Sequence, residues 1–362
     1  MQEWFQVTAG QATNRQGKAD YRLFRSISRL TGSARRDVLL GPMFGSDFGV
    51  INIGGGRVMA ISTDPIYINQ FMALEDASWF AFHVLVSDVA LSGLAPSHLA
   101  LSWNLPPELD DSTFVSMSRS FHNEAKALGI SVVTGHTGRY DGCATPVIGA
   151  GTSMAVGRRE RLVLPSGMRN GDRLIMTKSP AMETAILLAC EFRQGLIRHL
   201  GEDAVRGLQS RLHMLSPVAD AVVASGVHGI SAMHDASERG IYGALHELSR
   251  ASGLSFTIVS RDIVIEPVVK QIADLFGFDP LESSSEGTLL ITAEEESAAK
   301  VVRKLSRAGI TSCICGTVTK SRNRVSEIAP DGRLRVVDEP LTDGYLVAKT
   351  SRMGRLLRQG PA

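Results

Sequence analysis

The chain has 362 residues, 44% hydrophobic and 21% charged, values that are ordinary for a globular protein with a substantial core. This length indicates two domains or one large domain. The net charge of +1 gives no global field that would draw the protein to DNA, RNA or anionic lipid, so we expect neither a nucleic-acid partner nor a membrane partner.

The cysteines and the apolar segments exclude further classes of protein. No C-x-x-C pair is present, so the sequence carries neither a zinc signature nor a disulfide framework for a chain of this size. The first residues, MQEWFQVTAG, lack the basic start and the apolar run of a signal peptide. No apolar stretch approaches the roughly 18–20 residues that span a bilayer. We therefore expect a cytoplasmic protein.

Helical and extended patterns alternate along the first half of the chain. A hairpin is predicted over 50–62, where two β-rich runs flank a row of glycines, and a mostly buried helix is predicted over 79–92. The other elements predicted in this half are helices over 20–31 and 113–128 and strands over 97–105, 130–134 and 145–156.

A segment rich in glycine, arginine and proline, 157–172, is interpreted as the domain boundary. Beyond it the alternation continues, with helices over 181–200, 217–225, 239–252, 267–276 and 294–308 and strands over 173–177, 228–233, 254–259, 287–292 and 310–318. The predicted fold class is α+β with α/β-like layers. We expect an N-terminal domain at 1–157, a C-terminal α+β domain at 173–345 and a basic tail at 346–362.

The stretch 131-SVVTGHTGRY-140 ends a β-branched run at Gly135 and continues directly into His136 and Thr137. A strand that stops at a glycine and is followed by polar residues often delivers side chains to a site. A lone histidine in a loop is more often only a surface residue or a loop tie. The meaning of His136 therefore depends on the polar residues at other strand ends.

One apparent motif is set aside. The stretch 147-VIGAGTSMAVG-157 carries the G-x-G of a dinucleotide-binding fingerprint. However, Met154 occupies the third small position, and Gly157 arrives too soon for the helix that must follow. We interpret the stretch as a strand with closely packed backbone.

Aspartates at or near element ends form the more informative pattern: Asp47 before the hairpin, Asp64 at its end, Asp88 within an apolar helix, and Asp235 after a strand. Taken singly, Asp47 and Asp64 could be turn formers and Asp235 a helix cap. Asp88 lies among valines and leucines, where a carboxylate must find a partner, a proton or a cation. Several carboxylates without matching basic residues suit Mg²⁺, which also binds the phosphates of a nucleotide. This pattern favours phosphoryl transfer.

Short motifs in consistent order, from about residue 40 to 320, resemble the aminoimidazole ribonucleotide (AIR) synthetase superfamily. They are G-P-x-x-G-x-D (41–47), S-T-D-P (62–65), S-D-V-A-x-S-G-x-x-P (87–96), T-G-H-T (134–137), G-D-x-L-I-x-T (171–177), M-H-D-A-S-E-R-G (233–240) and S-E-G-T-L-L-I (285–291). The superfamily includes that purine enzyme, a hydrogenase maturation factor, selenophosphate synthetase and thiamine-monophosphate kinase. The chain is most similar to an uncharacterised, hydrogenase-maturation-like branch.

The resemblance implies a homodimer in which strands of the N-terminal domain join the partner's strands in a β-barrel, with the C-terminal α+β domain packed beside it. It implies ATP and Mg²⁺ in clefts near the interface. The implied reaction is phosphorylation, or ATP-driven activation, of an oxygen on a small-molecule substrate. Asp47, Asp64, Asp88 and Asp235 fall on the metal- and phosphate-binding aspartates of the family.

The resemblance also suggests roles outside the aspartates. His136 stands where much of the superfamily has a carboxylate, so His136 and Thr137 are candidate catalytic residues beside the transferred group, together with Asp88. The imidazole could ligate metal, act as an acid or base near neutral pH, or only hydrogen-bond a phosphate. Gly135 is a candidate ATP-binding residue. Lys18, in the reduced glycine-rich segment 14-NRQGKAD-20, could meet a phosphate or be solvated.

The chain also departs from its relatives. At 235-DASERG-240 a D-P-T-R-G-G-like motif has lost its proline and one glycine. No cysteine lies near 359–362, and the first cysteine is Cys143, so we expect the chain to inherit neither hydrogenase maturation nor selenophosphate synthesis from these relatives. Two alternatives to an ATP-dependent enzyme stay open. One is a non-catalytic, nucleotide-binding dimeric partner or regulatory protein, and the other is an oligomeric protein whose degenerate site does not bind ATP.

Overall fold

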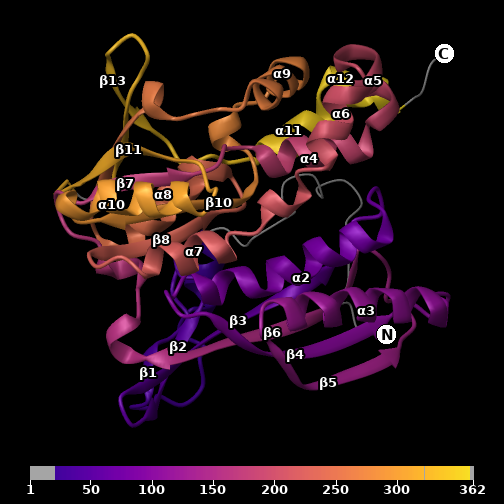
Figure 1. Cartoon of the computed structure of the whole chain (residues 1–362), viewed down its shortest axis with the longest axis horizontal. Coiled ribbons are helices and arrows are strands. Elements are labelled where there is room, and N and C mark those ends of the chain that lie inside the picture. Colours follow the sequence, from indigo (N-terminus) through magenta and orange to yellow (C-terminus); the bar gives the residue numbers. More distant parts are fainter. Residues whose placement is uncertain (1–20, 322, 359–362) are drawn as a thin grey trace.

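The computed structural model describes residues 21–321 and 323–358. Its strands form two sheets, one in each half of the chain, and helices lie between and beside them (Figure 1). The structure is therefore of the α+β class with mixed sheets. Lys18, a candidate ATP-binding residue, lies outside the described residues.

The N-terminal sheet has six strands in the order β1-β2-β3-β6-β4-β5. They are β1 (Val38–Leu40), β2 (Gly49–Gly54), β3 (Arg57–Tyr67), β4 (Pro96–Leu105), β5 (Ser131–Arg139) and β6 (Val147–Arg158). Only β4 and β5 are parallel neighbours, and the other pairs are antiparallel. Within the described chain this sheet is open, with β1 and β5 at its edges. The barrel expected from two subunits stays a prediction.

Two helices, α2 (Leu74–Ala90) and α3 (Asp111–Ala127), pack on one face of this sheet. α2 lies between the sheet and the C-terminal half, so it is buried on nearly all sides (Figure 1). This explains why its sequence is apolar around Asp88. α3 is exposed on one side and begins at Asp110, whose carboxylate accepts the Thr113 N–H. A short helix, α1 (Tyr21–Ile27), precedes the sheet.

The C-terminal sheet has seven strands in the order β13-β12-β9-β11-β7-β10-β8. They are β7 (Arg173–Thr177), β8 (Ile230–Ala236), β9 (Ser255–Val259), β10 (Ser285–Ala293), β11 (Ser312–Thr319), β12 (Val325–Ile328) and β13 (Leu334–Val337). The helices of this half are α4 (Met182–Glu191), α5 (Arg193–Leu200), α6 (Glu202–Gln209), α7 (Val218–Ser225), α8 (Gly240–Ser252), α9 (Pro267–Phe276), α10 (Glu295–Arg307), α11 (Gly344–Thr350) and α12 (Arg352–Arg358).

The two halves share one apolar core. A single cluster of buried side chains includes Phe82 and Leu85 of α2 together with Ile175 of β7 and Val301 of α10. A junction of this kind is packed like a domain interior, so side chains that it carries from both halves are held in fixed positions. Among the residues that the structure describes, no helix combines the length and the hydropathy needed to cross a bilayer.

Most predicted elements are confirmed within a few residues, and three predictions are corrected. The strand predicted over 130–134 continues as β5 to Arg139, so His136 and Thr137 lie in a strand and not in a loop. The helix predicted over 181–200 divides at Phe192 into α4 and α5. The sequence patterns missed β1, α6, β12, β13, α11 and α12, which are elements of three to eight residues.

Candidate functional site

The four predicted aspartates converge at the junction of the two halves. Asp47 lies in the loop between β1 and β2, Asp64 in β3 and Asp88 in α2, whereas Asp235 comes from β8. The charges of Asp47 and Asp235 both raise the pKa values of Asp64 and Asp88. Elements far apart in the chain therefore bring these carboxylates into one electrostatic cluster.

The cluster is short of positive charge. Burial, and next the charge of Asp47, raise the pKa of Asp64 to about 6. Burial also holds the pKa of Asp88 well above its usual value of 3.8, and the neighbouring charges that shift it most are all carboxylates. After burial, the charge of Asp64 is the strongest influence that raises the pKa of Asp88. The Ser62 hydroxyl donates to Asp64 at 3.3 Å.

Two glutamates extend the cluster on the C-terminal side. The Ser87 hydroxyl donates to Glu286 Oε1 at 2.9 Å, and the Glu286 N–H donates to Glu183 Oε2 at 2.8 Å. Burial raises the pKa of Glu183 to about 8 and that of Glu286 well above its ordinary value. Sequence analysis missed both. Glu286 stands in the quoted motif at 285–291, but nothing in the sequence marked Glu183.

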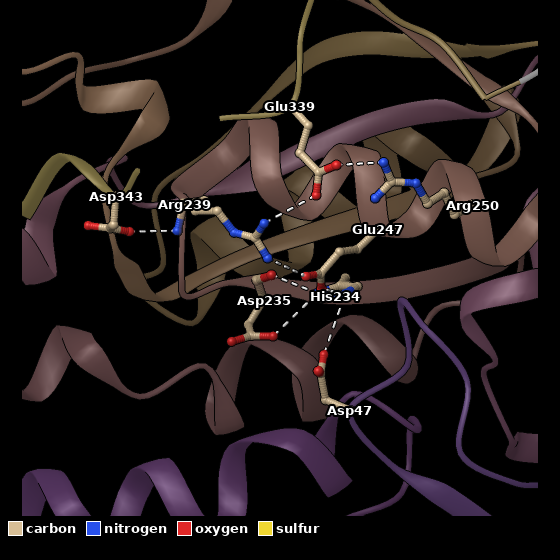
Figure 2. Close-up of polar contacts among 8 residues, drawn as sticks. All are labelled: Asp47, His234, Asp235, Arg239, Glu247, Arg250, Glu339 and Asp343. Atoms are coloured by element: carbon tan, nitrogen blue, oxygen red, sulfur yellow. Dashed lines mark hydrogen bonds and ion pairs between the residues drawn. The ribbon is translucent and has the colours of Figure 1, made fainter. Parts of the chain in front are cut away.

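A histidine that sequence analysis also missed lies among the carboxylates. His234, next to Asp235 in β8, is surrounded by Asp47, Asp235 and Glu247 (Figure 2). Its Nε2 lies 3.4 Å from Asp47 Oδ2 and 3.2 Å from Glu247 Oε2. Burial lowers the pKa of His234, but the three carboxylates outweigh burial and hold that pKa well above 6.5.

A network of ion pairs and hydrogen bonds borders the cluster on the side of the C-terminal half (Figure 2). We call it the C-terminal wall, and it consists of Arg239, Glu247, Glu339 and Asp343. Arg239 Nη2 lies 3.6 Å from Glu247 Oε1, and Arg239 Nη1 lies 3.2 Å from Glu339. Arg239 has a left-handed backbone with φ of 61°, and its N–H donates to Asp343 at 2.6 Å. Asp343 also accepts the Ser284 hydroxyl at 2.8 Å, so it ties together two loops beside the cluster.

The structure places the other candidate residues elsewhere in the N-terminal sheet. Gly135, His136 and Thr137 lie in the edge strand β5, where the His136 ring nitrogen bonds the Tyr140 hydroxyl at 2.5 Å. The strand register places Gly135 three strands away from Asp64. Three strand spacings correspond to about 14 Å, so one chain does not bring this segment to the carboxylates. Their catalytic and ATP-binding roles stay predictions.

A pocket of 370 Å³ opens beside the cluster. Asp47, Ser62 and Thr63 form part of its wall, together with residues of β1 and β2. Asp47 and Ser62 therefore line a space that a ligand can enter. Ser62 is also the hydroxyl donor to Asp64.

Two family models match the chain, one over each sheet. The model of the AIR synthase related protein N-terminal domain matches residues 45–156, and that of its C-terminal domain matches residues 169–328. Among curated proteins, carbamoyl dehydratase HypE of Azotobacter vinelandii is 26% identical over 298 residues, covering 78% of this chain and 82% of its own. HypE of Escherichia coli is 26% identical over 259 residues, covering 70% and 73%.

Solved structures share the fold. A thiamine-monophosphate kinase complex, AaThiL with AMPPCP and TMP, has a TM-score of 0.67 at 20% identity and covers 90% of this chain and 96% of its own. HypE in complex with ATP has a TM-score of 0.62 at 19% identity, covering 92% and 98%. HypE from a HypE–HypF complex has a TM-score of 0.67 at 18% identity, covering 88% and 99%.

Proposed function

Because the chain belongs to the AIR synthase related family, we propose that it binds ATP with Mg²⁺ and phosphorylates, or otherwise activates, an oxygen of a small-molecule substrate. The observation that carries this proposal is the convergence of Asp64 and Asp88 with Asp235 across the junction of the two halves. Relatives named as dehydratases, and fold neighbours with ATP or AMPPCP bound, support the same chemistry.

The carboxylates fit a hard divalent cation and a nucleotide. Burial, and next the charges of neighbouring carboxylates, raise the pKa values of Asp64 and Asp88. A cation with oxygen ligands relieves this repulsion, and the phosphates of a nucleotide supply its remaining ligands. Asp47, Asp64, Asp88 and Asp235 would hold Mg²⁺, which neutralises charge on the transferred phosphoryl group when it is bound.

The two buried glutamates would handle protons. Glu183 and Glu286 lie beside the cluster, and burial raises the pKa of Glu183 to about 8 and that of Glu286 well above its ordinary value. A carboxyl group with a pKa near the working pH can accept a proton from a substrate hydroxyl or return one to a leaving group. Ser87 fixes the orientation of Glu286 by donating a hydrogen bond to it. The substrate oxygen would therefore lie on the Glu286 side of the cluster.

Calorimetric titration of the protein with ATP and Mg²⁺ tests the proposal. Asp64→Asn keeps the shape of the side chain but removes its charge, so we expect binding to weaken at least about tenfold. Asp331→Asn, which changes an exposed aspartate that bonds only local groups, is the matched control. Absence of ATP binding by the folded wild-type protein would contradict the proposal.

One observation favours a second function, that of a nucleotide-binding partner or regulatory protein without turnover. A fold neighbour, HypE, is found in a complex with another protein, HypF. ADP release in the presence of candidate substrates separates the two functions, because a regulatory protein would bind ATP without forming ADP. ADP formation that Asp64→Asn abolishes and Asp331→Asn preserves would exclude the regulatory function.

We also propose that the protein is a homodimer. The face of the N-terminal sheet opposite α2 and α3 displays apolar side chains, among them Met59 and Ile61 of β3 and Met154 and Val156 of β6. The edge strand β5 exposes Val132 and Val133. A second copy of the chain would cover this face and extend the open sheet, because edge strands and apolar faces are otherwise liabilities.

A further inference from the structure

His234 lies among carboxylates in an arrangement that offers a nitrogen ligand to a metal ion, unlike a magnesium site built from oxygen ligands alone. The side chain of His234 is only 3% exposed. Its Nδ1 lies 2.7 Å from the backbone carbonyl of Asp235, and its Nε2 has no hydrogen-bond partner. A buried polar atom without such a partner is costly, and here it is directed among carboxylates.

The hydrogen bond of Nδ1 determines which nitrogen can bind a metal. A carbonyl oxygen only accepts, so Nδ1 must carry a hydrogen and donate it. Nε2 is then the atom that can coordinate, once a metal ion displaces the hydrogen that the surrounding carboxylates favour on it. A hydrogen bond of this kind on the opposite nitrogen is the usual way in which a ligating histidine is oriented. The bond therefore aims Nε2 at Asp47 and Glu247.

The distances around Nε2 match those between two ligands of one metal ion. Zinc and similar ions bind nitrogen and oxygen at about 2.1 Å, which places neighbouring ligand atoms about 3.0 Å apart in octahedral and about 3.4 Å apart in tetrahedral geometry. Nε2 lies 3.4 Å from Asp47 Oδ2 and 3.2 Å from Glu247 Oε2. Ligand atoms of Asp47, His234 and Asp235 all lie within 4.8 Å of one another.

We propose that His234, Asp47 and Asp235 bind a divalent transition-metal ion through Nε2 and two carboxylates, with Glu247 as the third neighbouring oxygen donor. An imidazole ligand favours Mn²⁺, Co²⁺ or Zn²⁺ over Mg²⁺, which prefers oxygen ligands alone. The site shares Asp47 and Asp235 with the proposed magnesium site. It goes beyond the proposed function because it adds a nitrogen ligand and requires neither ATP nor a substrate.

The ligands are held in place without the metal. Gly45, two residues before Asp47, packs so closely on α8 that an added Cβ would lie 2.2 Å from the carbonyl oxygen of Glu247. Glu247 is held from the other side by Arg239, and Arg239 by Glu339. Figure 2 shows Asp47 entering from the N-terminal half and the other ligands from the C-terminal half. A fixed set of ligands of this kind favours binding over a flexible one.

Electron paramagnetic resonance of Mn²⁺ bound to the nucleotide-free protein tests the site. We expect tight binding of one Mn²⁺ and ¹⁴N modulation of its electron spin echo, which reports a directly bound nitrogen. Growth with ¹⁵N-labelled histidine should replace the ¹⁴N pattern in the wild-type protein, so this test does not depend on the folding of a variant. His234→Asn should abolish the modulation and weaken Mn²⁺ binding at least about tenfold, with little change for Mg²⁺.

His199→Asn is the matched control, because the His199 ring bonds the Gly195 carbonyl within α5, which carries none of the proposed ligands. The modulation should persist in this variant. Bound Mn²⁺ without nitrogen modulation in the wild type would overturn the proposal, as would modulation that survives His234→Asn. Failure of ATP binding leaves these results unaffected, so the two proposals fail separately.

Discussion

Replacing Gly45 by alanine would test whether the contact between the Gly45 loop and α8 holds the metal ligands in position. Gly45 has a φ of +84°, and a Cβ added there would lie 2.2 Å from the carbonyl oxygen of Glu247. Non-bonded carbon and oxygen atoms need more than 3 Å, so the loop or α8 must move by roughly 1 Å. Both contacting groups are backbone or tightly packed, which leaves no flexible side chain to absorb the shift.

The expected effects follow from this displacement. Metal–ligand distances tolerate changes of only about 0.2 Å, so a loop that moves by roughly 1 Å withdraws the Asp47 carboxylate from any bound ion. We expect affinity for Mn²⁺, and for ATP with Mg²⁺, to fall about tenfold or more. The free energy of unfolding should fall by about 1–3 kcal/mol from overpacking, in addition to about 1–2 kcal/mol of left-handed backbone strain.

Gly142→Ala is the matched control for the strain. Gly142 has a nearly equal φ of +86°, but nothing lies within 4 Å of an added Cβ. Thermal unfolding and calorimetric titration of both variants separate the two effects, because only Gly45→Ala carries the steric clash. Equal stability losses and unchanged metal affinity in the two variants would refute the role assigned to the contact.

Three other predictions concern the proton chemistry, the C-terminal wall and the dimer. Folding raises the pKa of Glu183 from 4.5 to about 8, so the folded state binds more protons and its stability falls as pH rises through that window. The variant Glu183→Gln, measured in EDTA, should lose this decline in stability. A stability difference between variant and wild type that does not depend on pH would contradict the prediction. Asp343→Asn should lower the unfolding free energy by about 1.5–3 kcal/mol by weakening the bonds that hold Arg239 and Ser284, whereas Asp331→Asn, measured alongside, should change it little. Ile61→Lys should convert a dimer to a monomer in sedimentation, and a wild-type monomer would exclude the dimer.

The sequence predicted the aspartate cluster because its argument concerned charge and not exact position. Asp88 among apolar residues demanded a partner, and Asp64 of β3 and Asp235 of β8 lie near enough to shift its pKa. The assignment of mixed α and β layers also held, because long elements such as α3 and β4 repeat their buried residues with the periods of a helix and a strand.

The C-terminal wall could not be predicted from the sequence. Glu339 and Asp343 lie beyond the last strand that the patterns predicted and beyond residue 328, where the C-terminal family match ends. Their role depends on the backbone of Arg239, whose left-handed φ is set by tertiary contacts and leaves no mark on residue type. Ion pairs between segments about a hundred residues apart are invisible to local periodicity.

The two histidines show where the local argument stopped too early. Sequence analysis singled out His136 because it seemed to follow a strand end, but pairing with β4 extends β5 past it and leaves it exposed. His234 stands in 233-MHDASERG-240, directly after the strand predicted over 228–233, and the sequence analysis assigned it no role. The reasoning applied to Asp88 holds equally for a histidine in an apolar strand, since a buried imidazole also needs a partner, a proton or a cation. Applied to every polar residue within an apolar run, that reasoning selects His234 from the sequence, whereas the role of His136 stays a prediction.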